Sequence, residues 1–255
     1  MLISVKNSFE ARTAAEHPLV SIVDLKNPST GSLGFAGATM ANEVINTVRQ
    51  ADPDKQISLA CGELDQWRLG GDDRKADFDV CELERIDWSA VTFVKVGLSG
   101  NFAAAQDVGR LKRFFSLVPD HVRRVLVIYV DLFSTGQAKE AIRESAALNA
   151  SVVLLDTFDK SHGNTFAYYS RAECQAIFQL AKSQKMTGVL AGSIDVECLS
   201  RAAETGADLI GVRGAVCQQG DSPVSEIRKN SLCQRRLNQF LDAARVILAE
   251  ARPVS

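Results

Sequence analysis

RVLVIYV, residues 124–130, is an arginine followed by six consecutive apolar residues, and similar runs recur along the whole chain. Near-continuous Val, Ile and Leu without strict alternation is typical of a strand buried on both faces of a parallel sheet. The other runs are LISV (2–5), LVSIVDL (19–25), ISLA (57–60), VTFVKV (91–96), SVVLL (151–155), GVLAG (188–192) and LIGV (209–212). Eight predicted strands at this spacing indicate a closed barrel.

The segments between these runs have apolar residues spaced by three and four, as in amphipathic helices. Asn7 or Ser8, Ser134 or Thr135, and Asp195 are suitable N-caps for three of them. We expect helices over 8–17, 38–50, 102–118, 135–150, 170–185, 195–207 and 225–251, the last of which would complete the barrel. The fold class is therefore α/β, a single (β/α)8 TIM barrel formed by one domain over residues 1–255, a usual length for this architecture.

Composition excludes several classes of function. The 29 Lys and Arg residues against 31 Asp and Glu residues give a net charge of -2, so no basic footprint for nucleic acid or an anionic membrane exists. The six cysteines form no CxxC pair, which favours reduced structural thiols. Without an evident leader or a long apolar span, we expect a cytoplasmic protein with a small phosphorylated substrate that self-associates through its outer helices. The three scattered histidines predict no metal, and we expect no cofactor.

Charged residues stand where several predicted strands end. Asp24 and Lys26 follow the run at 19–25, Lys95 lies within VTFVKV, and Asp156 and Lys160 follow SVVLL. The carboxyl ends of barrel strands meet at the face that carries the active site. A lysine held there in a low dielectric, near a second cation, has a lowered pKa and a nucleophilic amine. The pattern predicts Schiff-base chemistry, with Lys95 as the second cation near Lys26.

Each of these residues also has a structural interpretation. Asp24 and Lys26 could form an ion pair that plugs the barrel rim, and Lys95 could extend its side chain to the mouth of the barrel. Asp156 could cap a helix while Lys160 is solvated, although a spacing of four also lets the two meet on a helical turn. Spacing alone leaves these alternatives open.

Two glycine-rich loops follow the last two predicted strands, where α/β barrels hold phosphate through backbone N–H groups. LAGSI (190–194) and GVRGA (211–215) supply the candidate phosphate-binding residues Gly192, Ser193, Arg213 and Gly214. The alternative is that these glycines only form tight turns.

Two further segments are irregular. NPSTGSLG (27–34) is suited to a second anion site or a mobile lid. The charged stretch 62–87 is expected to be a solvated loop with a helix around CELERI. Gly97, after VTFVKV, is expected to let the backbone approach a ligand closely.

Taken in order, DLKNPSTGSLG, FVKVGL, LLDTFDK, LAGSI and GVRGAVC resemble the (5-formylfuran-3-yl)methyl phosphate synthase family over most of the chain. The resemblance implies an aldolase-like barrel, a carbon–oxygen lyase acting on phosphates. It would condense two molecules of glyceraldehyde 3-phosphate, with loss of phosphate and water, in the biosynthesis of methanofuran, a cofactor of one-carbon metabolism.

Carried onto this sequence, the resemblance makes Lys26 the imine-forming amine. Asp24, Lys95, Asp156 and Lys160 match the other polar positions of the family's site. Two other functions remain open: another Schiff-base aldolase of sugar phosphates, and a barrel that binds a phosphorylated metabolite without catalysis.

Overall fold

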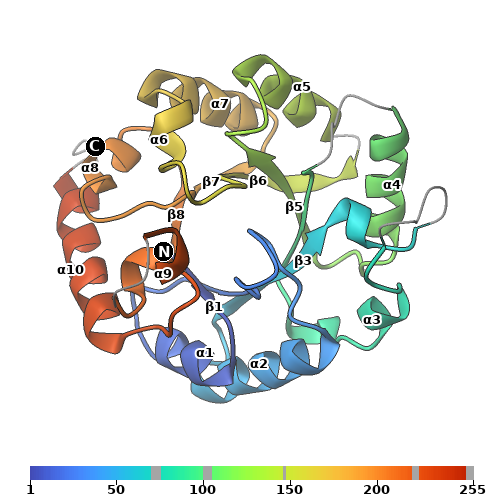
Figure 1. Ribbon diagram of the computed structural model, residues 1–255, viewed down its shortest axis with the longest axis horizontal. Helices are drawn as coiled ribbons and strands as arrows, with labels where there is room; N and C mark the ends of the chain where they lie inside the picture. The colour runs from blue at the N-terminus through green and yellow to red at the C-terminus, as the bar shows by residue number, and fades with distance from the viewer. Residues whose placement is uncertain (70–75, 100–104, 146–147, 220–223, 251–255) are drawn as a thin grey trace.

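The computed structural model describes residues 1–69, 76–99, 105–145, 148–219 and 224–250, and its strands close into one parallel barrel in sequence order (Figure 1). Strand β8 pairs with β1, and every neighbouring pair is parallel. The strands are β1 (Leu2–Val5), β2 (Ile22–Leu25), β3 (Gln56–Glu63), β4 (Phe93–Gly97), β5 (Arg123–Tyr129), β6 (Ala150–Asp156), β7 (Thr187–Leu190) and β8 (Leu209–Val212). The predicted (β/α)8 barrel is confirmed.

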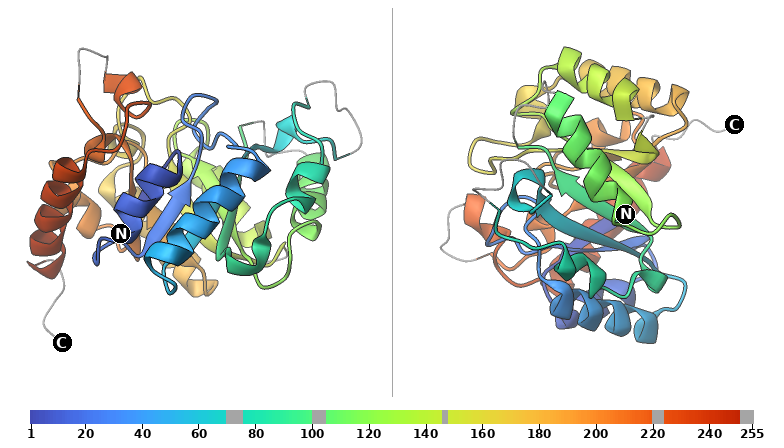
Figure 2. Two further views of the ribbon diagram at one scale, coloured as in Figure 1. Left: turned by 90° about the horizontal axis from the view of Figure 1, so that it is seen from below. Right: turned by 90° about the vertical axis from the view of Figure 1, so that its right-hand side faces the viewer.

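Helices form an outer ring around the strands (Figures 1 and 2). They are α1 (Ser8–Ala15), α2 (Ala38–Ala51), α3 (Cys81–Glu84), α4 (Ala105–Ser116), α5 (Thr135–Ser145), α6 (Thr165–Tyr168), α7 (Arg171–Ser183), α8 (Leu199–Ala203), α9 (Val224–Ile227) and α10 (Gln234–Glu250). The side chain of Asn7 accepts a hydrogen bond from the Glu10 N–H and caps α1, as expected. The first residues of the helix expected over 102–118 lie outside the described ranges.

The expectation of a single helix over 225–251 is wrong, because the segment between α9 and α10 is not helical. The backbone groups of this segment are bound elsewhere. The Leu232 N–H donates to Glu10 Oε1, and the carbonyls of Arg228 and Asn230 accept from the Arg213 guanidinium. These tertiary hydrogen bonds replace intrahelical ones, so helical periodicity alone could not reveal the break.

The stretch expected to be a solvated loop after β3 is partly packed into the molecule. Trp67 is fully buried and contacts the rings of Phe35, Phe78 and Phe114 at centroid distances of 5.2–5.6 Å. Residues 70–75 of this stretch lie outside the described ranges. The helix expected around CELERI is confirmed as α3, whereas the expectation of a solvated loop is wrong for the part around Trp67, because its aromatic residues pack against the rest of the molecule.

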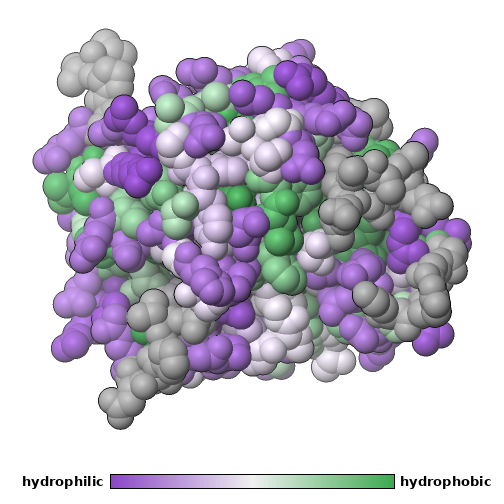
Figure 3. All heavy atoms as spheres, turned by 45° about the horizontal axis from the view of Figure 1, so that its top comes forward, coloured by the Kyte–Doolittle hydropathy of each residue, from purple (hydrophilic) through white to green (hydrophobic). Residues whose placement is uncertain are grey.

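Hydrophilic and hydrophobic residues are mixed on the face drawn in Figure 3. Hydrophilic residues dominate the face in Figure 3, and hydrophobic ones show in smaller areas between them. No helix in the described ranges is both long and apolar enough to cross a bilayer. Within those same ranges, no group of three or more His, Cys, Asp or Glu side chains could hold a metal ion.

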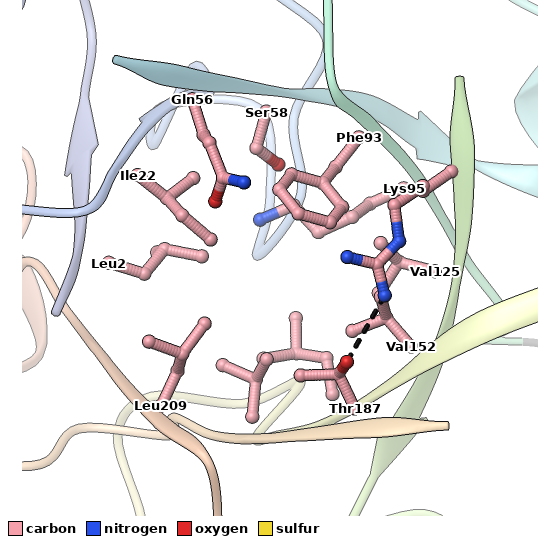
Figure 4. A pocket seen from close by; sticks show the side chains of 13 residues that line it. Leu2, Ile22, Gln56, Ser58, Phe93, Lys95, Val125, Val152, Thr187 and Leu209 are labelled. Carbon is pink, nitrogen blue, oxygen red and sulfur yellow. Dashed lines mark hydrogen bonds between the residues drawn. The ribbon is translucent and has the colours of Figure 1, made fainter. Parts of the chain in front are cut away.

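Inside the barrel, a small cavity of about 70 Å³ lies among residues near the amino ends of the strands (Figure 4). Its wall is mainly apolar, with Gln56, Ser58, Lys95, Arg123 and Thr187 as polar members. Lys95 lines both this cavity and the larger one at the carboxyl ends of the strands. The lysine side chain is therefore enclosed by the barrel interior and does not extend out to solvent.

Candidate active site

A cavity of about 520 Å³ opens at the carboxyl ends of the strands, and all five predicted polar site residues line it. Asp24 comes from β2, Lys26 follows β2, Lys95 comes from β4, Asp156 ends β6, and Lys160 lies in the loop after β6. Each of the five is buried or nearly so, and the Lys26 residue is only 8% exposed. The barrel thus gathers three amines and two carboxylates in one water-poor space.

Asp24 of β2 and Lys95 of β4 form a buried ion pair inside the barrel, although β3 lies between their strands. Lys95 Nζ lies 2.5 Å from Asp24 Oδ1, and the Ser4 hydroxyl donates to Asp24 Oδ2 at 2.9 Å. Both side chains are at most 3% exposed. The predicted alternative, an ion pair of Asp24 with Lys26, is therefore replaced by one with Lys95, and the amine of Lys26 stays available to the cavity.

Asp156 and Lys160 form a second buried pair. The Lys160 ammonium donates to Asp156 Oδ1 and, at 3.0 Å, to the Thr157 hydroxyl. They meet on a bent loop, not on a helical turn. Asp131, at the end of β5, shapes that loop because its carboxylate accepts the N–H groups of Phe158 and Asp159 at 2.8 and 2.7 Å. The alternative of a solvated Lys160 is wrong, since its side chain is 8% exposed.

Lys26 is the amine best suited to attack a carbonyl. Desolvation by burial lowers its pKa to about 7, with attraction by Asp156 opposing the shift and repulsion by Lys160 adding to it. Asp24 and Lys95 have smaller effects of opposite sign. The expectation that a second cation lowers this pKa holds, but Lys160 contributes more than the predicted Lys95, whose charge is balanced by Asp24.

This pKa predicts the pH dependence of imine formation. Only the neutral amine attacks a carbonyl, so the rate constant for borohydride trapping of a bound aldehyde on Lys26 should rise through pH 7 and level off about one unit above it. The measurement is the trapping rate at a series of pH values, with the modified residue identified by mass spectrometry. A rate that keeps rising toward pH 10, as for an ordinary lysine, would contradict the lowered pKa.

The predicted phosphate loops line the same cavity. Gly192 and Ser193 both have positive φ angles, 87° and 56°, and a Cβ on Gly192 would lie 2.1 Å from Thr165 Oγ1. Gly192 is therefore required both by its backbone conformation and by the close approach of α6. Gly214 begins a 3₁₀ turn, η4 (Gly214–Val216), and a Cβ there would meet only open space. Backbone N–H groups on these turns remain the candidates for binding phosphate.

Arg213 also lines the cavity, but its guanidinium is bound within the protein. Nη1 lies 2.9 Å from Glu10 Oε2 and donates to the Ser4 carbonyl, while Nε and Nη2 donate to the carbonyls of Arg228 and Asn230. This buried network joins α1, β1 and the segment before α10. In this arrangement Arg213 holds the barrel closed, so a phosphate contact would have to compete with four protein acceptors.

Arg228 was not predicted, and it anchors the segment 27–34 beside Lys26. Its Nη1 donates to the carbonyls of Pro28 and Gly31 at 2.8 and 3.1 Å, and the residue lines the cavity. The segment is also closed on itself, because the Asn27 N–H donates to the Gly34 carbonyl at 2.7 Å. No pattern in the sequence links Arg228 to this segment, since the two lie about 200 residues apart.

The model of the family described as 4-HFC-P synthase matches residues 1–239. A (5-formylfuran-3-yl)methyl phosphate synthase of Methanothermobacter thermautotrophicus is 30% identical over 252 residues, which cover 95% of this chain and 99% of the relative. Another protein of that name, from Methanococcus maripaludis, is 29% identical over 90% of this chain and 94% of its own.

Solved structures support the fold. Phosphoribosyl anthranilate isomerase of Thermus thermophilus superimposes with a TM-score of 0.59 at 14% identity, covering 98% of each chain. At that identity the likeness concerns the barrel alone. The family match and the relative at 30% identity each span most of the chain, and this chain therefore belongs to the 4-HFC-P synthase family.

Proposed function

We propose that this protein condenses two molecules of glyceraldehyde 3-phosphate to (5-formylfuran-3-yl)methyl phosphate, through an imine on Lys26, in the biosynthesis of a methanofuran-type cofactor. The observation that carries the proposal is the buried Lys26 amine, with its pKa of about 7, on the wall of a cavity with two carboxylates and two further amines. The family membership, which covers residues 1–239, supports the choice of product.

The proposed reaction begins with attack of neutral Lys26 on the aldehyde carbon of one substrate, and water leaves to form the imine. The imine is an electron sink, so the proton on the adjacent carbon becomes acidic. Asp156 is suited to take this proton: burial alone would raise the pKa of Asp156, but the ammonium groups of Lys160 and Lys26 lower it overall and keep the carboxylate ionised.

Loss of phosphate from the next carbon follows, and the remaining three-carbon fragment is joined to the second molecule. Ring closure, dehydration and hydrolysis of the imine release Lys26 and the furan. The net balance is two substrate molecules in, and one furan phosphate, one phosphate and two molecules of water out. No oxidant or reductant is required, and each step is a proton transfer, an addition or an elimination of the kind that amines and carboxylates catalyse.

Direct assay of the purified protein tests the proposal. Incubation with glyceraldehyde 3-phosphate alone should release inorganic phosphate and produce a furan-like ultraviolet absorbance. Borohydride added during turnover should trap a covalent adduct on Lys26, identified by peptide mass spectrometry.

The other two functions predict different results. A different Schiff-base aldolase would give the Lys26 adduct with a sugar phosphate but no furan absorbance. A barrel that only binds a metabolite would give neither product nor adduct, and an unmodified Lys26 during turnover would contradict the imine mechanism.

A further inference from the structure

A row of hydrogen-bonding side chains leads away from the active-site carboxylate of Asp156. The Ser32 hydroxyl lies 3.4 Å from Asp156 Oδ2 and 3.0 Å from the Thr157 carbonyl. The Ser32 hydroxyl is also placed to donate to the Tyr129 oxygen, and the Tyr129 hydroxyl donates to Glu63 Oε1 at 2.6 Å. Four side chains from β3, β5, β6 and the segment 27–34 are thus connected in the order Asp156, Ser32, Tyr129, Glu63.

The surrounding structure holds this row in place. A Cβ on Gly97 would lie 2.1 Å from Glu63 Oε2, so glycine at the end of β4 leaves room for the Glu63 carboxylate. The Ser99 N–H donates to the same oxygen at 3.1 Å. The fully buried Tyr129 ring packs against Phe158 at a centroid distance of 5.3 Å. The expectation that Gly97 admits a ligand is corrected: its neighbour is Glu63.

The row leads out of the catalytic cavity. In the part of the chain that the structure describes, Ser32, Tyr129 and Glu63 are not among the residues that line that cavity. Ser32 and Tyr129 are at most 1% exposed, whereas Glu63 is half-buried. Two phosphorylated substrates would fill the mouth of the cavity, so proton exchange with solvent needs a second route.

The proton affinities of the two ends differ in the direction that such a route needs. Burial raises the pKa of Glu63, against the opposing effect of its hydrogen bonds with Tyr129 and Ser99. The pKa of Asp156 is lowered, as its neighbouring ammonium groups overcome the effect of burial. Glu63 therefore binds a proton more tightly than Asp156 does, so a proton that Asp156 takes from substrate tends to move toward Glu63.

We propose that Glu63, Tyr129 and Ser32 form a proton relay that exchanges protons between solvent and Asp156 while substrates occupy the cavity. The inference rests on the proposed function. Asp156 gives a proton that it has taken from substrate to Ser32 Oγ, Ser32 gives its own to Tyr129 Oη, and Tyr129 gives its own to Glu63 Oε1, to which it already donates. Each O–H bond that breaks is replaced by one that forms, and Glu63 passes its proton to solvent. The reverse sequence, after the two hydroxyl groups rotate, returns a proton to Asp156.

Two conservative variants test the relay. Tyr129→Phe keeps the ring but removes the connection, and Glu63→Gln keeps an oxygen that accepts from Tyr129 but cannot exchange a proton in this way. Each should lower kcat roughly 10- to 100-fold, since proton transfer would become limiting, and leave KM within about threefold. The double variant should be no slower than the slower single variant, because either change interrupts the same row.

The matched control is Tyr169→Phe, which removes another buried tyrosine hydroxyl, one that donates to the Phe133 carbonyl at 2.7 Å. It should keep kcat within about twofold. Wild type should show a bowed dependence of kcat on the fraction of D₂O, as expected when several protons move together. A purely structural role for Tyr129 or Glu63 would not produce that bowed dependence.

The outcomes separate the two proposals. If wild type forms the furan and both folded variants match its kcat, or if the isotope dependence of wild type is linear and the double variant is additive, the relay is overturned and the function stands. If wild type neither releases phosphate nor gives a Lys26 adduct, the proposed function fails and the relay fails with it. Circular dichroism and thermal melting confirm that each variant is folded.

Discussion

Lys26→Met is expected to lower kcat by at least about 10⁴-fold, because the reaction loses its nucleophile and not merely a supporting charge. Methionine is close to lysine in length, and the site is enclosed, so the folded structure should tolerate it. The measurement is the rate of phosphate release and furan formation, together with borohydride trapping. Both turnover and the adduct should be lost.

Lys26→Arg is the matched control for charge. It keeps a cation at this position but has no amine that loses its proton near neutral pH. It should be as inactive as Lys26→Met if the residue acts as a nucleophile. Turnover of either variant within about 100-fold of wild type would show that another amine forms the imine, with Lys95 and Lys160 as the remaining lysines on the cavity wall.

Lys95→Met should destabilise the fold by about 3–5 kcal/mol and also abolish turnover, because it leaves the Asp24 carboxylate buried without its counter-ion. Among the described residues, Asp24 Oδ1 has the Lys95 ammonium at 2.5 Å as its counter-ion and accepts no other hydrogen bond. The check is the free energy of unfolding from a urea titration, with the same slope required for wild type and variant.

A double variant separates the two effects of this pair. Lys95→Met combined with Asp24→Asn removes both charges and leaves an amide oxygen to accept from Ser4. Its stability should return to within about 1–2 kcal/mol of wild type, while activity should not return. If the double variant is no more stable than Lys95→Met, the loss of stability does not come from the unpaired charge of Asp24.

An exposed ion pair supplies the control. Arg245 and Asp242 lie 3.5 Å apart on α10, and both side chains are about two-thirds exposed. Arg245→Met should cost less than about 1 kcal/mol, because water screens an exposed pair and solvates the remaining charge. The contrast with Lys95 would show that burial, and not the number of ion pairs, determines the effect.

Much of the architecture could be read from the chain. Buried parallel strands must be apolar on both faces, so eight runs such as RVLVIYV were enough to predict a closed barrel. Polar residues at the ends of those runs had to meet at one face, which is why Asp24, Lys95 and Asp156 were expected in one site, where the structure places them.

Partners within the site could not be read in this way. Sequence spacing left open an ion pair of Asp24 with Lys26, but the barrel places Lys95 of β4 against Asp24. Arg213 was predicted to bind phosphate, and the structure also places its guanidinium against Glu10 of α1. The contacts of a long side chain depend on which strand or helix lies opposite it. Closure of the barrel decides which elements face each other, and sequence spacing does not.

The local pattern of this chain determined the barrel, the face at which its charged residues gather and the types of those residues, because strand burial and strand ends depend on neighbours in sequence. Only the tertiary structure decided that Lys160 contributes most among the cations that lower the pKa of Lys26, and that Gly97 makes room for Glu63 behind Asp156. Those outcomes depend on burial and on distances between residues far apart in the chain. Electrostatic interactions change steeply with both quantities, and neither is encoded in spacing along the sequence.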